Sequence, residues 1–369
     1  MTRRAAVCNT VQSVNPSADR DAVTGFRSSP HHRPLRHVRA AGILALALAS
    51  THCSTRAPAP VGQGPRPFPS IADSPPPDKA PLLRVKVVVN GFAEIRHLPV
   101  EEYVSGSVPA EMPVGQPNPA LADRLARLQA ILARTYALAN LGRHAHDGFD
   151  LCSTTHCQVY RPAEEQTSAV AARVSAAVES THGLVVSDGQ EIIEALFHAD
   201  CGGHTSSATT VWGGPAPPYL EGVKDHFCVI APRDDWKVRL ERSHLHRILA
   251  TAEDTNPGNR LDRIRVLERD QAGRVVSIEI VGERTTVVRG ERFRAVVARQ
   301  LGARSFRSTR FQIIAAATTV EFTGDGFGHG VGLCQTGAIA RARRGHTVEA
   351  ILAHYYPGTT LQTVERGTS

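Results

Sequence analysis

The sequence predicts an α+β protein built from helices and short strands. Apolar residues recur at helical spacing in several segments, and short Val- and Ile-rich runs flanked by turn residues predict strands. The two kinds of segment follow one another without the regular strand–helix–strand order of a doubly wound sheet. Hydrophobic residues make up 41% of the chain and charged residues 21%, a composition typical of a globular protein with an ample core.

Residues 1–53 are predicted to be an export leader. Residues 40–49 form an apolar run behind three arginines, too short to span a bilayer and arranged like a secretory signal. Cys53 is a candidate site for a lipid anchor, although the residues before it match a lipoprotein signal poorly. A plain signal peptide cleaved near residue 50 is the alternative. In either case we expect the mature protein outside the cytoplasm, in the periplasm or cell envelope, where disulfides are stable.

The net charge of +7 does not indicate a nucleic-acid-binding protein. Residues 1–40 hold seven arginines and two aspartates, so the rest of the chain carries only about +2. Residues 54–81 hold nine prolines and few large apolar side chains, which predicts a semi-extended tether. We expect the folded domain over residues 82–362 and a short tail at 363–369.

Local signals place the elements of this domain. A Val-rich strand is expected at 82–90, and its partner strand at 93–98, around the hairpin turn Asn90-Gly91. A helix is expected at 119–141, because Asn118-Pro119 supplies an N-cap and a first-turn proline ahead of regularly spaced leucines. The remaining segments predict helices at 169–182, 243–252, 290–301, 335–344 and 347–356, and strands at 183–186, 190–199, 263–268, 275–281, 284–288 and 311–322.

Glu111 is the first candidate for a catalytic role. It stands in Val108-Pro-Ala-Glu-Met-Pro113, between two prolines and before a helix. Prolines stiffen a loop, so this segment is predicted to hold a carboxylate at little entropic cost. Taken alone, the segment favours the plainer interpretation of an exposed glutamate without a role.

Glycine occupies every second position from Gly324 to Gly332, followed by Cys334-Gln335. In an extended segment this pattern removes the side chains from one face, so a ligand or another backbone can approach closely. Tight packing of a strand on a helix is the structural alternative. No dinucleotide-binding or phosphate-loop pattern is present, which argues against nucleotide binding.

Residues 144–157 carry two cysteines and three histidines, a composition typical of a metal site. The candidate ligands are His146, Cys152, His156 and Cys157, a Cys₂His₂ set that closed zinc sites use. The alternative is a Cys152–Cys157 disulfide with free surface histidines.

A further cysteine pair follows Phe197-His-Ala-Asp-Cys-Gly-Gly-His204. We expect Cys201 and Cys228 to form a disulfide in an oxidising compartment. Trp212 lies between them and is a candidate for stacking on a sugar face, with a core aromatic as the alternative.

Together these segments resemble the SpoIID/LytB family of cell-wall proteins. The motifs that carry the resemblance lie in order between about residues 84 and 361: Pro-Ala-Glu-Met-Pro, Ala-Arg-Thr-Tyr-Ala, Cys-Gln-Val-Tyr, Cys-Gly-Gly-x-Thr, Pro-Tyr-Leu, Gly-His-Gly-Val-Gly-x-x-Gln-x-Gly-Ala and Tyr-Tyr-Pro-Gly-Thr. Each is weak alone, but their combination is specific. The resemblance implies a mixed SpoIID-like fold with a catalytic cleft. It also implies a lytic transglycosylase acting on MurNAc-GlcNAc strands whose stem peptides an amidase has removed.

The resemblance also implies roles for single residues. Glu111 corresponds to the family's catalytic glutamate. Arg134 and Tyr160 fall at positions that the family places at the cleft, and His198 stands where sporulation members often carry tyrosine. With Trp212, His329 and Gln335 they complete the predicted substrate contacts. Some members hold zinc in a similar His/Cys loop, which implies a structural zinc here.

One carboxylate suffices for the implied reaction. The acid protonates the glycosidic oxygen and, as a base, then activates the 6-hydroxyl of the same sugar, which closes a 1,6-anhydro ring; hydrolases generally use two carboxylates. Two other functions compete with this one. The first is a non-catalytic, glycan-binding amidase enhancer. The second is a zinc hydrolase using His144, His146 or His204, although no His-Glu-x-x-His pattern exists.

Overall fold

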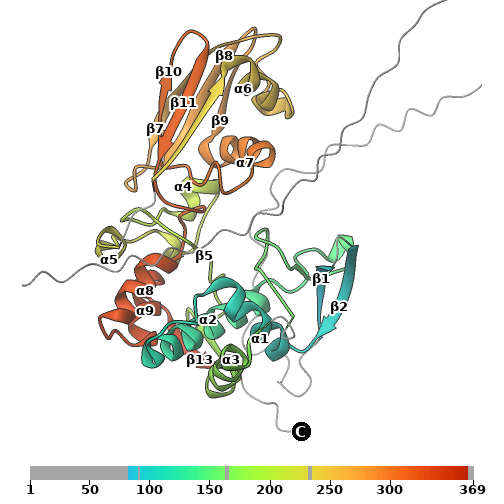
Figure 1. The fold of residues 1–369 in the computed structure, drawn as a ribbon, viewed down its shortest axis with the longest axis vertical. Coiled ribbons are helices and arrows are strands. Elements are labelled where there is room, and N and C mark those ends of the chain that lie inside the picture. Colours follow the sequence, from blue (N-terminus) through green and yellow to red (C-terminus); the bar gives the residue numbers. More distant parts are fainter. Residues whose placement is uncertain (1–81, 90–91, 163–165, 232–234, 365–369) are drawn as a thin grey trace, which may run out of the picture. The chain divides into compact units, whose positions relative to one another are not determined.

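Two clusters of buried hydrophobic residues organise the protein. A computed structural model describes residues 82–89, 92–162, 166–231 and 235–364; the predicted leader, the tether and most of the tail lie outside them. The first cluster draws on residues 83–228 and again on 331–364, and the second on residues 236–322. Helices and short strands are mixed throughout, which confirms the predicted α+β class (Figure 1). In the part of the chain that the structure describes, no helix combines the length and hydropathy needed to cross a membrane.

The first cluster begins with a small sheet. Strands β1 (Leu83–Val89) and β2 (Phe92–Leu98) pair antiparallel as predicted, and the Asn90-Gly91 turn itself lies outside the described residues. β3 (Leu151–Cys152) pairs parallel with the other edge of β1. This pairing fixes the middle of the segment 144–157, the Cys/His loop, against the sheet.

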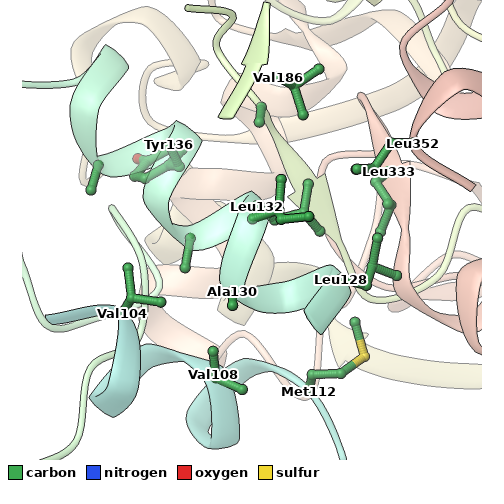
Figure 2. Packing of buried hydrophobic residues seen from close by; sticks show 14 of the residues in the cluster. Val104, Val108, Met112, Leu128, Ala130, Leu132, Tyr136, Val186, Leu333 and Leu352 are labelled. Carbon is green, nitrogen blue, oxygen red and sulfur yellow. The ribbon is translucent and has the colours of Figure 1, made fainter. Parts of the chain in front are cut away.

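Two helices form the centre of this cluster. α2 (Pro119–Ala139) begins as predicted, with the Asn118 side chain accepting a 3.0 Å hydrogen bond from Leu121 N. α1 (Val100–Glu111) precedes it and packs on it. Figure 2 shows Val108 of α1 beside Ala130 of α2 within this cluster. Glu111 is therefore the last residue of a helix and not, as predicted, part of a loop.

The proline in α1 explains why the sequence did not reveal this helix. Pro109 has no N–H, so the carbonyl of Ser105, four residues earlier, loses its helical partner. The Gln166 side chain replaces that donor with a 3.1 Å hydrogen bond to Ser105 O. Burial of Val100, Tyr103, Val104, Ser107 and Val108 on one face holds the helix in place.

Short pairings join distant segments around these helices. β4 (Leu184–Ser187) pairs antiparallel with β13 (Thr360–Thr363), and β5 (Phe197–His198) pairs parallel with β12 (Leu333–Cys334). The predicted strand at 190–199 is wrong except at β5, because the residues before it form only an isolated bridge at Ile192. The other elements are α3 (Ser168–Ser180), α4 (Ala208–Trp212), α5 (His226–Val229), α8 (Gln335–Arg343), α9 (Val348–Tyr355) and the 3₁₀ turns η2 (Ala145–Asp147) and η4 (Pro218–Leu220).

The second cluster lies within two three-stranded sheets and two helices. The sheets have the orders β7-β8-β9 and β10-β11-β6, and Figure 1 shows α6 and α7 beside their strands. Trp236, Phe293, Phe306, Phe311 and Phe322 pack ring against ring in its core. The elements are β6 (Trp236–Glu241), α6 (Arg242–Leu249), η5 (Glu253–Thr255), β7 (Leu261–Arg269), β8 (Val275–Gly282), β9 (Thr285–Arg289), α7 (Gly290–Leu301), β10 (Phe311–Ala315) and β11 (Thr319–Gly324).

One predicted strand of this part is a hairpin. The segment 311–322, predicted as a single strand, reverses at residues 316–318, and β10 pairs antiparallel with β11. The turn is Ala316-Ala-Thr318, closed by a hydrogen bond from Ala316 N to Thr319 O. It contains neither glycine nor proline, so the usual turn signal is missing.

Gly106 tests the packing of α1. A Cβ at this position would overlap the Tyr160 ring and lie 2.5 Å from the Arg161 carbonyl oxygen. Alanine favours a helix by about 1 kcal/mol over glycine, but we expect the clash to dominate and Gly106→Ala to lower the free energy of unfolding by about 1–3 kcal/mol. Urea unfolding followed by circular dichroism measures this. Gly115→Ala is the control, because a Cβ there meets nothing within 4 Å; equal stability of both variants would contradict the packing described.

Candidate active site

Glu111 lies where three sequence motifs meet. Its side-chain Oε1 accepts a 2.6 Å hydrogen bond from Val159 N, in the Cys-Gln-Val-Tyr motif. Its main-chain oxygen accepts a 2.8 Å hydrogen bond from Gln335 Nε2, which follows the glycine-rich segment. The contacts therefore join residues 48 and 224 positions away from the glutamate in sequence.

Burial sets the protonation of this carboxyl. Desolvation raises the pKa of Glu111 above the ordinary value, and the hydrogen bond from Val159 N opposes the rise because it favours the carboxylate. Among the described residues, no neighbouring carboxylate contributes to the shift. The site thus offers one acid with an increased tendency to carry a proton.

The segment that holds Val159 is itself firmly placed. The Tyr160 ring is buried and stacks on Tyr103 of α1, with centroids 5.5 Å apart and planes at 8°. The Tyr103 hydroxyl donates a 3.2 Å hydrogen bond to Gln158 Oε1. Tyr160 therefore lies beside α1 and supports the backbone next to Glu111.

Arg134 has a different role from the predicted substrate contact. Its side chain is only 1% exposed, and it donates two hydrogen bonds, of 2.8 and 2.6 Å, to the carboxylate of Glu101. A further hydrogen bond of 3.1 Å reaches Leu184 O at the start of β4. The guanidinium thus ties α2 to α1 and β4, and no substrate can reach it without displacing these partners.

Four residues of the Cys/His loop bring their donor atoms together. The ring nitrogens of His144 and His156 and the sulfurs of Cys152 and Cys157 all lie within 4.8 Å of one another. His144 Nε2 is 3.2 Å from Cys157 Sγ, and His156 Nδ1 is 3.6 Å from the same sulfur. Two nitrogens and two sulfurs at such spacing fit a tetrahedral metal ion.

One predicted ligand differs from those in this group, and the alternative Cys152–Cys157 disulfide is not formed. His146 lies in the η2 turn, exposed, and His144 takes its place among the four. Phe149 stacks on the His144 ring at 4.6 Å and directs it toward the cysteines. Cys152 and Cys157 are free thiols. His204 hydrogen-bonds Thr205 O at 2.6 Å and belongs to no candidate metal group among the described residues.

His329 of the glycine-rich segment belongs to a cluster of three rings. His329 lies 5.4 Å from His198 and 5.3 Å from Trp212, measured between ring centroids. Trp212, at the end of α4, is 44% exposed, so it is not the core aromatic of the alternative interpretation. The three predicted contacts His198, Trp212 and His329 thus form one group with an accessible indole face.

Burial disfavours the protonated form of both histidines of this group. Burial lowers the pKa of His329 to about 4 and lowers the pKa of His198 well below its ordinary value. His329 Nδ1 accepts from Val331 N at 3.1 Å, so its proton is on Nε2, 3.0 Å from Phe197 O. His198 uses Nδ1 toward Val331 O at 3.1 Å, and in the described part of the chain its buried Nε2 has no partner.

The glycine-rich segment packs against the protein's own chain. A Cβ on Gly332 would overlap the Leu196 carbonyl oxygen, and one on Gly330 would overlap Arg274 Nε. The φ angles of Gly330 and Gly332 are 87° and 70°, so the segment is not the extended strand that the alternation suggested. At these two positions the glycines therefore allow close packing within the protein, which is the structural alternative to a ligand-binding face.

The predicted Cys201–Cys228 disulfide is not formed. Both residues are free, buried thiols. A third sulfur lies beside this pair: Cys334 Sγ accepts a 3.3 Å hydrogen bond from Cys201 N and belongs to the same group of potential metal ligands. The sequence places Cys334 after the glycine-rich segment without indicating a role for it, and no motif indicates Asp225, the fourth member of that group.

Comparison with known proteins places the chain in a family. Residues 89–187 match the family described as Stage II sporulation protein (SpoIID), and residues 233–332 match a domain of unknown function (DUF8618). An uncharacterized protein of Brachyspira hyodysenteriae is 32% identical over 273 residues, which cover 74% of this chain and 69% of that protein. Stage II sporulation protein D of Bacillus subtilis is 28% identical, over 78% of this chain and 81% of its own length.

A further relative is the amidase enhancer of Bacillus subtilis. It is 27% identical over 70% of this chain, and the match covers 40% of its own length. The chain belongs to the SpoIID/LytB family, and this membership supports a cell-wall-related function. The second matched region coincides with the part of the chain that forms the second hydrophobic cluster.

The raised pKa of Glu111 predicts a pH-dependent stability difference. As pH rises above the ordinary glutamate pKa of 4.5, the unfolded chain ionises before the folded one, so wild-type stability falls until the raised folded pKa is passed. Glu111→Gln has no such group. We therefore expect its stability relative to wild type to increase as pH rises through this window, measured by urea unfolding at several pH values. A constant difference would show that the carboxyl is not perturbed.

Proposed function

We propose that this protein is an exported lytic transglycosylase that cleaves MurNAc-GlcNAc strands of peptidoglycan, preferably stripped of stem peptides. The observation that carries the proposal is the half-buried carboxyl of Glu111 at the junction of three family motifs. Family membership supports the cell wall as its place of action. Export rests on the sequence of residues 1–53 alone.

The geometry of Glu111 supports a reaction that needs one acid/base. The protonated carboxyl donates its proton to the glycosidic oxygen, and the bond from that oxygen to C1 breaks. The resulting carboxylate takes a proton from the C6 hydroxyl of the same sugar, whose oxygen bonds to C1 and closes the 1,6-anhydro ring. No water is consumed, and the carboxyl ends protonated again.

The other site residues support binding and positioning. Trp212 offers an exposed indole face for stacking on a sugar, beside the neutral imidazole of His329. Gln335 holds the main-chain oxygen of Glu111, and Tyr160 stacks on α1 next to Val159, the donor to the Glu111 side chain; both act as positioning residues. Arg134 anchors α1 through its ion pair with Glu101.

We also propose that His144, Cys152, His156 and Cys157 hold a structural zinc ion. The donor set is closed, with four protein ligands and no position for an activated water. Such an ion would stabilise the Cys/His loop, and with it the position of Val159, whose N–H donates to Glu111. This makes the zinc hydrolase the weaker alternative.

A non-catalytic role is the second candidate. A relative named amidase enhancer shares 27% of its residues with this chain over the matched region, which supports glycan binding that stimulates an amidase. The accessible Trp212 ring suits binding as well as cleavage. Cleavage of isolated glycan by the purified protein distinguishes the two.

The decisive experiment incubates the protein with amidase-stripped glycan strands and detects 1,6-anhydro ends by mass spectrometry. We expect wild type to produce them and Glu111→Gln to be slower by about 10²–10⁴-fold, because the acid/base is removed. Wild-type activity should fall as pH rises through the raised pKa of Glu111, since the reacting form is protonated. Glu102→Gln is the matched control, an exposed acid on the same helix.

Two outcomes would contradict the proposal. One is a Glu111→Gln variant that cleaves at the wild-type rate. The other is a folded wild-type protein that binds glycan and stimulates an amidase without forming anhydro ends, which would establish the enhancer role instead.

A further inference from the structure

A second group of potential metal ligands lies outside the Cys/His loop. The sulfurs of Cys201, Cys228 and Cys334 and a carboxylate oxygen of Asp225 all lie within 4.8 Å of one another. All four residues are buried, with exposed fractions of at most 2%. They come from the segment after β5, from α5 with the residue before it, and from the end of β12.

The spacing of this group fits tetrahedral coordination. Zinc–sulfur bonds of about 2.3 Å and zinc–oxygen bonds of about 2.0–2.2 Å place neighbouring ligands roughly 3.5–3.8 Å apart. Cys201 Sγ is 3.6 Å from Asp225 Oδ2. The largest separation, within 4.8 Å, requires only a small inward movement of side chains.

Backbone N–H groups already point at two of the sulfurs. Gly203 N lies 3.3 Å from Cys201 Sγ, while Cys201 N and Gly337 N lie 3.3 and 3.4 Å from Cys334 Sγ. Cys334 also caps the N-terminus of α8 with its sulfur. N–H donors and a helix N-terminus favour a thiolate, the form of cysteine that binds metal.

Hydrogen bonds hold the Asp225 carboxylate in a fixed orientation. Asp225 is fully buried and accepts hydrogen bonds from the Tyr355 hydroxyl at 2.7 Å and from Cys228 N at 3.3 Å. Arg341 Nη2 lies 3.6 Å from its other side and offsets part of the negative charge. Gly337 lets the helix approach, because a Cβ there would overlap Asp225 Oδ2. Such partners hold a metal-binding side chain in one rotamer.

We propose that Cys201, Asp225, Cys228 and Cys334 form a second, structural metal site for a thiophilic divalent cation of the zinc type. Three soft sulfur donors select such an ion over magnesium or calcium. Four protein ligands leave no open coordination position, so the ion does not take part in glycan cleavage. A Cys201–Cys228 disulfide would instead use two of the four donors and leave Cys334 as a buried free thiol beside it.

The site would brace the segment that positions Glu111. Cys334 directly precedes Gln335, whose side chain holds the main-chain oxygen of Glu111. An ion at Cys334 therefore ties this contact to the Cys201 turn and to α5. The proposal is independent of whether the protein cleaves glycan.

The experiment counts metal ions in the full-length chain. We purify wild type and two double variants, Cys152→Ser with Cys157→Ser and Cys228→Ser with Cys334→Ser, and measure zinc per chain by mass spectrometry of the elements. The first variant removes the loop ligands and leaves the proposed site intact. We expect it to fold, by circular dichroism, and to retain about one zinc per chain. Its cobalt-loaded form should show the thiolate-to-metal absorption of a sulfur-rich tetrahedral site.

Peptide mapping provides the second measurement. Wild type is denatured with a chelator but without reductant and then alkylated. We expect alkylation at Cys201, Cys228 and Cys334, because a metal site releases free thiols. A folded loop variant without metal, or a linked Cys201–Cys228 peptide, would overturn the proposal. If the loop variant does not fold, the wild-type zinc count decides: about two ions per chain support the second site, and fewer overturn it.

Discussion

The glycine-rich segment passes so close to its neighbours that no side chain larger than hydrogen fits at several of its positions, and much of the described structure is built on this contact. At Gly330 the neighbour is Arg274, a fully buried arginine from the part of the chain that forms the second hydrophobic cluster. Its guanidinium donates to Gly328 O at 2.9 Å and to Asp200 O at 3.2 Å. A buried cation is costly unless its donors are satisfied, and these carbonyls satisfy Nη1 and Nη2, whereas Nε, which faces Gly330, has no hydrogen-bond partner among the described residues.

The same segment continues directly into the candidate active site. After Gly332 the chain pairs with β5 through β12, and then Gln335 reaches the main-chain oxygen of Glu111. The ring group of His198, Trp212 and His329 also depends on this path, because Val331 supplies hydrogen bonds to both histidines. This one stretch of backbone thus fixes the ring group, the buried Cys334, and Gln335, whose side chain holds the main-chain oxygen of Glu111. A substitution at Gly330 would disturb all of them, although it touches none directly.

The sequence predicted correctly those features of the fold that depend on residues close together in the chain. The start of α2 followed from Asn118 and Pro119, because a cap acts within three residues. The same reasoning failed at α1, where Pro109 indicated a loop and the compensating donor is Gln166, 61 residues from the carbonyl it satisfies. In the Cys/His loop, composition identified the metal group, but the choice between His144 and His146 depended on the packing of Phe149. The Cys201–Cys228 pair looked complete because nothing in the sequence places Cys334, 133 residues after Cys201, beside it.

The position of Glu111 at the end of α1 suits the proposed role of an acid that also acts as a base. The C-terminal end of a helix carries a partial negative charge, which, together with burial, disfavours the carboxylate and keeps the proton available for donation. Once the proton has left, the Val159 N–H stabilises the carboxylate at 2.6 Å. Burial thus raises the pKa of Glu111 and the Val159 N–H opposes that rise. The proposed reaction uses both effects, because the same group gives a proton and takes one back.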